Sequence, residues 1–229
     1  MKGLLKQKRE EWLSRQEQLS WLRLGGCFVT VMLSCGIRLP GGLSPFGTAA
    51  TMALPGNYTL AAFGGAMAGY AVFGSFEENL ARMVALICAL GLKLLVMDLP
   101  RLRQSSPFLS TAAALLMGGC LTARSLLLDL GNLDLLFCLG EAVLCGALCY
   151  FAFHGGRALV CGKLEELDPL CRMSLLLLGL TALTGICQLE VMLLNPGRIL
   201  VGAILLATGH RRGHQAALTA GVCCATAMT

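Results

Sequence analysis

The chain has 229 residues, of which 56% are hydrophobic and only 14% are charged. Soluble domains carry about 25% charged residues, so this composition leaves too little polar surface for a water-soluble globule and indicates a membrane protein. The net charge of +5 comes without a basic face studded with aromatic side chains, which argues against nucleic-acid binding and favours contact with an anionic lipid bilayer.

The chain begins with a basic arm, residues 1–19, which the positive-inside rule places in the cytoplasm. The apolar run after it lacks a small-x-small cleavage site, so we interpret it as a membrane span and not as a removable signal peptide. We assign residues 20–229 to one multi-span membrane domain. Because the chain stops at Thr229 within an apolar run, we expect a domain cut from a longer protein.

A membrane helix needs about 20 mostly apolar residues. On that measure we predict an all-α polytopic bundle with about eight to nine transmembrane segments and a cytoplasmic N-terminus. The predicted spans are residues 20–37, 42–56, 58–75, 80–99, 108–123, 132–153, 173–190, 197–209 and 215–229.

The second span, 42–56, is short and bounded by prolines. Pro45 lies near its first turn, where the missing N–H would be unpaired in any case, and Pro55 with Gly56 ends it. Counting it as a crossing keeps most lysines and arginines of the later loops in the cytoplasm. The outer side then holds Arg38, Arg82, Arg124 and Arg198. Whether 42–56 and 197–209 cross fully or dip in and return is left open.

Two glycines in the third span, Gly65 and Gly69, have GxxxG spacing, which allows another helix backbone to approach closely. This spacing favours helix packing over homodimerisation, with self-association kept as an alternative.

Two charged residues lie inside predicted spans. A bare carboxylate at Glu141 is costly in lipid unless it is neutralised, paired or facing water. It is either a proton or cation relay or a packing group, and we favour packing because no second acid, histidine or broken helix is visible beside it. Lys93 could pair with Glu141 if their helices adjoin, but we favour snorkelling toward the cytoplasmic headgroups.

No chemistry is assigned to the other polar features of the sequence. Residues 154–172 are interpreted as the longest cytoplasmic connection, with Asp168 capping the next helix. His210 and His214 are assigned to a basic turn and not to a zinc site. The twelve cysteines are scattered without a CxxC pair and are interpreted as packing residues. No nucleotide, metalloprotease or hydrolase motif is present, so we predict no catalytic, cofactor or metal site in these residues.

Several stretches together resemble the N-terminal membrane region of the stage II sporulation protein E family. They are the basic arm, SPFGTAATMAL in the short span, LGEAVLCGALCYF around Glu141, and ELDPLCRMSLLLLGLTALTGI, which leads into a later span. In that family, membrane spans precede a manganese-dependent serine phosphatase domain of the PP2C type. That phosphatase activates the first forespore-specific sigma factor, and the protein works with the division protein FtsZ at the asymmetric septum.

The resemblance implies that these residues are the membrane-anchoring and localisation module, at the polar sporulation septum of the cytoplasmic membrane. The metal-binding aspartates of such phosphatases have no counterpart here, so manganese is expected only for the absent domain. The alternatives are a small transporter or permease subunit with Glu141 as its functional carboxyl, and a scaffold that shares only the architecture.

Overall fold

The computed structural model describes residues 20–39, 41–96, 98–129, 131–161 and 168–187, and beyond them 200–203, 205–207, 210, 218, 221 and 225. In these residues the chain is helical between short turns, with a single isolated bridge between Leu39 and Leu43 and no strand. The all-α prediction is therefore confirmed for the described part. The basic arm, His214 and most of the last two predicted spans lie outside it.

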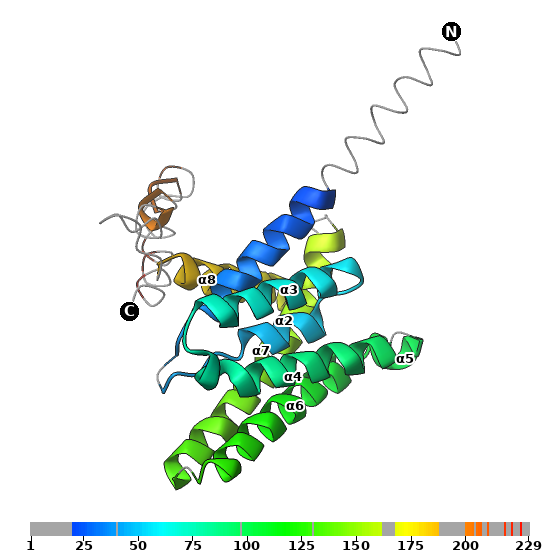
Figure 1. Ribbon diagram of the computed structural model, residues 1–229. Coiled ribbons are helices and arrows are strands. Elements are labelled where there is room, and N and C mark those ends of the chain that lie inside the picture. Colours follow the sequence, from blue (N-terminus) through cyan, green and yellow to red (C-terminus); the bar gives the residue numbers. More distant parts are fainter. Residues whose placement is uncertain are drawn as a thin grey trace.

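The helices follow one another closely along the chain (Figure 1). A first helix, Ser20–Cys35, precedes the numbered ones. The others are α2 (Phe46–Ala53), α3 (Asn57–Val72), α4 (Phe76–Val96), α5 (Pro100–Arg103), α6 (Ser106–Leu127), α7 (Asn132–Cys161) and α8 (Pro169–Cys187).

Three of the described helices are long and apolar enough to cross a membrane. They are α4, α6 and the part of α7 from Asn132 to Gly156. Long apolar side chains stay exposed along them, including Ile87 and Leu95 on α4, Leu115 on α6 and Val143 on α7. Exposed apolar faces of this extent are compatible with contact to lipid. The membrane prediction is thus supported in its coarse form by three candidate spans.

The core lies where α2, α4, α6 and α7 meet (Figure 1). Small side chains such as Ala85, Ala113 and Cys145 are fully buried there, and Met52 of α2 and Met117 of α6 fill the space between them. Small residues allow helix backbones to approach closely, which is how apolar helices gain packing energy without help from the hydrophobic effect in lipid.

The first helix and α3 run parallel. Gly65 of α3 lies against Phe28, and one turn further along both helices Gly69 lies against Met32 and Cys35. Two parallel helices that follow each other in the chain need a return between them. Residues 36–56 supply it, so this segment does carry the chain back to the end where the first helix starts.

The helix in this return is shorter than the span predicted for 42–56. The helix α2 has eight residues, which at 1.5 Å per residue extend over about 12 Å, less than half of a hydrocarbon core of about 30 Å. The described residues before it, 36–39 and 41–45, are irregular, and nearly every side chain of α2 is buried. We therefore correct the short span to a buried half-helix, the name used for α2 below.

The bundle has two ends, which we name by their residues. The Arg38 end holds the described residues 36–39, 41–45, 73–75, 128–129 and 131, and the Pro100 end holds the turn at 54–56 and the short helix α5 with its neighbours 98–99 and 104–105.

One predicted connection is shorter than expected. The helix α7 continues through residues 154–161, for which the sequence predicts a loop, and α8 begins at Pro169 directly after Asp168. The backbone carbonyl of Asp168 accepts a hydrogen bond from the N–H of Arg172 (3.1 Å).

Candidate functional site

A buried ion pair joins α4 to α7. The guanidinium of Arg82 donates from Nε to Oε1 of Glu141 (2.7 Å) and from Nη2 to Oε2 (2.9 Å). Arg82 is 7% exposed and Glu141 is 2% exposed, so neither charge is solvated by bulk water. Two parallel bonds between a guanidinium and a carboxylate form the strongest kind of ion pair, and they fix the orientation of both side chains.

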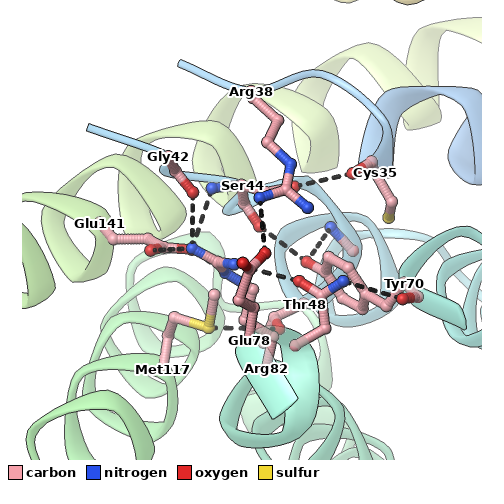
Figure 2. Close-up of polar contacts among 12 residues, drawn as sticks. Cys35, Arg38, Gly42, Ser44, Thr48, Tyr70, Glu78, Arg82, Met117 and Glu141 are labelled. Atoms are coloured by element: carbon pink, nitrogen blue, oxygen red, sulfur yellow. Dashed lines mark hydrogen bonds and ion pairs between the residues drawn. The ribbon is translucent and has the colours of Figure 1, made fainter. Parts of the chain in front are cut away.

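The same pair binds the chain just before the half-helix (Figure 2). The backbone N–H of Ser44 donates to Oε1 of Glu141 (3.0 Å), and Nη2 of Arg82 donates to the carbonyl oxygen of Gly42 (2.8 Å). The Asn79 side chain accepts a further bond from Nη1 of Arg82 (3.1 Å). Two charged side chains thus hold the irregular segment that leads into α2.

A tyrosine continues the network toward α3. The hydroxyl of Tyr70 donates a hydrogen bond to the carbonyl oxygen of Ser44 (2.7 Å). It also accepts one from the N–H of Gly47 (3.3 Å), in the first turn of the half-helix. The hydroxyl of Ser44 donates to the carbonyl oxygen of Cys35 (3.0 Å) at the end of the first helix. Asn79 donates to the carbonyl oxygen of Tyr70 (2.8 Å), which links α4 back to α3.

Arg82 was not predicted as a site residue, because it was counted among the charges on the outer side, at the start of the predicted span 80–99. The helix α4 begins four residues earlier than the predicted span, at Phe76, so Arg82 lies in its second turn and is buried. Glu77 and Glu78 in the first turn suit the positive amino end of the helix dipole, and they were the available signal for this earlier start.

Lys93 also differs from its prediction. It neither pairs with Glu141 nor snorkels outward, since it is only 8% exposed. Its ammonium donates to the carbonyl oxygens of Thr51 (3.0 Å), Met52 and Leu54, at the carboxyl end of the half-helix. The helix α4 therefore binds the segment before α2 through Arg82, and the carboxyl end of α2 through Lys93.

The prolines flank the half-helix. Pro45 is the residue directly before α2, and its carbonyl oxygen accepts a hydrogen bond from the N–H of Ala49 (3.3 Å). Pro55 follows Leu54, which is the cap residue directly after the end of the helix at Ala53.

The GxxxG glycines contact the first helix of the same chain. A Cβ added at Gly65 would overlap the carbonyl oxygen of Phe28, and one at Gly69 would lie 2.6 Å from that of Met32. Both positions require glycine because of this close backbone approach. Since this face is occupied within the chain, a second copy could use it only by displacing the first helix.

The Arg38 end also carries an exposed ion pair, which Figure 2 draws together with the buried one. Nη1 of Arg38 forms an ion pair with Oε2 of Glu78 (3.1 Å), and Nη2 donates to the carbonyl oxygen of Phe73 (3.1 Å). Arg124 of α6 donates to the backbone carbonyl of Glu78 (3.0 Å). These contacts connect the return segment, the end of α3, α4 and α6 at the Arg38 end.

In this buried site the charges of Arg82 and Glu141 neutralise each other. Each oxygen of the Glu141 carboxylate accepts a bond from Arg82, and Oε1 accepts a second one from Ser44. Among the described residues, no group of three histidines, cysteines or acids lies together as metal ligands would, and the cysteines are free thiols. The site is therefore suited to holding helices in place.

No protein-family model, curated protein or solved structure matches this chain.

Proposed function

We propose that this chain is a membrane-anchoring and localisation module. The observation that carries the proposal is the closed network at the half-helix, in which Glu141, Arg82 and backbone groups satisfy one another and α2 is held at both ends. A bundle with apolar outer faces and internally paired charges is suited to a rigid membrane platform. The chain itself carries out no catalysis on this proposal.

The resemblance to the membrane region of stage II sporulation protein E supplies the specific part of the proposal. On that basis the module places a serine phosphatase domain at the asymmetric sporulation septum, together with FtsZ and septal membrane proteins. Manganese would belong to the phosphatase domain. The N-terminus lies in the cytoplasm, and the full bundle has about eight to nine spans.

Localisation tests this proposal directly. A fluorescent fusion of the chain is expressed in a sporulating bacterium that lacks its own stage II sporulation protein E. We expect the signal to concentrate at the polar septum, compared with a control fusion to an unrelated membrane bundle that labels the whole envelope. Uniform labelling by both fusions would contradict the localisation function.

Reporter fusions test the orientation. Alkaline phosphatase is active only after export, so we expect activity when it is joined after Gly74 or Gly131, at the Arg38 end. We expect none when it is joined after Gly56 or Gln104, at the Pro100 end, where a fluorescent reporter should instead be bright. The opposite pattern would place the N-terminus outside and remove the basis for a cytoplasmic partner domain.

A transporter or permease is the second candidate, favoured by one observation. The half-helix is a broken segment whose amino end lies against Glu141, and broken helices of this kind bind substrates and coupling ions in many transporters. Uptake of a protonatable substrate analogue into vesicles would exceed that of Glu141→Gln vesicles if this function holds. Equal uptake by both proteins, at equal amounts of folded protein, would dismiss it.

A further inference from the structure

The carboxyl end of the half-helix leaves carbonyl groups that the backbone cannot satisfy. The last four carbonyls of any helix have no intrahelical partner. Here the N–H of Leu54 returns to the carbonyl of Ala50 (3.1 Å), but the next residue is Pro55, which has no N–H to offer Thr51. Thr51 and Met52 are buried, so bulk water does not replace the missing donor.

The ammonium of Lys93 fills this place from α4. It has three N–H donors, and it contacts three backbone carbonyl oxygens, those of Thr51, Met52 and Leu54. The negative end of a helix dipole adds to the attraction for a cation. The sign of the charge and the N–H donors of the ammonium therefore suit this end of the half-helix. The carbonyl oxygen of Leu54 also accepts from the hydroxyl of Thr59 (2.6 Å), so it is the buried carbonyls of Thr51 and Met52 that depend most on Lys93.

We propose that the carboxyl end of α2 is a binding site for a primary ammonium ion, which the chain fills with its own Lys93 side chain. The carbonyls of Thr51, Met52 and Leu54 form the site, and Lys93 acts as a tethered ligand that positions the half-helix. The proposal does not depend on the anchoring function, since it concerns only how α2 is held. Nor does it depend on the Arg82–Glu141 pair at the other end of α2.

The proposal is tested by removing the ligand and supplying it again. Lys93→Ala deletes the four atoms beyond Cβ, and propylammonium has the same three carbons and one nitrogen. We expect Lys93→Ala to lower the apparent melting temperature of the full chain in detergent by about 10 °C, because buried carbonyls lose their donors. Propylammonium should restore at least half of that loss, measured as monodisperse protein that survives heating.

Four controls test whether the ammonium group itself is required. Tetramethylammonium carries the charge without N–H donors, and propanol has the chain length without the charge, so neither should rescue Lys93→Ala. Lys93→Met keeps most of the side-chain volume, so it should be destabilised yet gain little from propylammonium. Wild type should not respond to any of the three compounds.

Other outcomes would overturn the site. They are a Lys93→Ala protein as stable as wild type, no rescue by propylammonium, or equal rescue by all three compounds. If Lys93→Ala cannot be purified alone, it is expressed and purified with propylammonium, and recovery only under that condition supports the site. Failure to recover it, together with Lys93→Met behaving as wild type, would contradict it.

Discussion

Glu141→Gln is expected to destabilise the bundle by about 3–5 kcal/mol, the usual cost of removing one partner from a buried ion pair. The guanidinium of Arg82 stays charged at any accessible pH, so the variant leaves an uncompensated cation among buried groups. We expect the amount of protein in the membrane fraction to fall and the apparent melting temperature to drop by about 10 °C. A glutamine tolerated as well as the glutamate would mean that the carboxyl is a neutral packing group.

Three comparisons make this result more specific. Arg82→Gln should cost less than Glu141→Gln, because a carboxyl left alone can take up a proton whereas a guanidinium cannot. The double variant should cost less than the sum of the single ones, which is the signature of a direct interaction. Arg38→Gln breaks the exposed pair with Glu78, where the side chains are 38% and 55% exposed, and should behave almost as wild type.

Gly65→Ala is the second change with a large expected effect. The added methyl group would overlap the backbone of Phe28, and a backbone atom cannot move aside as a flexible side chain can. Overpacking of this kind costs about 1–3 kcal/mol or more, which outweighs the gain of about 1 kcal/mol in helix propensity from replacing glycine. We expect lower heat stability and loss of contact between the first helix and α3.

The adjacent residue provides a matched control. At Gly64 the nearest atom to an added Cβ is a ring carbon of Phe28 at 3.4 Å, an ordinary contact. Gly64→Ala should therefore keep or raise the stability, as measured by the same heating assay. If both variants had equal stability, the close approach of the two helices at Gly65 would be wrong.

The long apolar helices could be predicted from sequence because each one contains its own signal. The runs that became α4, α6 and α7 are apolar over about the length that a membrane requires, and only their ends were misplaced. The half-helix was harder, because Pro45 and Pro55 mark its ends but not how much of the segment between Arg38 and Gly56 is helical. Its length depends on contacts with α4 and α7, which lie far along the chain.

Of the site, the sequence pattern singles out Glu141 and Lys93 but does not give the correct partners of either. Arg82 is 59 residues from Glu141, and no local pattern connects them. Because an unpaired charge is costly in lipid, Glu141 and Lys93 must each have a binding partner. Which residues those partners are depends on how the helices pack. Lys93 was judged by its position in the cytoplasmic half of its predicted span, whereas its ammonium binds the carbonyls of the half-helix.

The charges at both ends of α2 bear on how the chain is assembled during synthesis. Residues 36–56 emerge from the ribosome before Arg82, Lys93 and Glu141, the three side chains that later hold them. Until α4 has entered the bilayer, Lys93 is not in place to bind the carboxyl end of the half-helix. Until α7 follows, Arg82 lacks its ion-pair partner Glu141. The half-helix therefore reaches its final position late, through contacts among segments that are already inserted. Nascent chains arrested before residue 141 should be favoured substrates of membrane quality-control proteases.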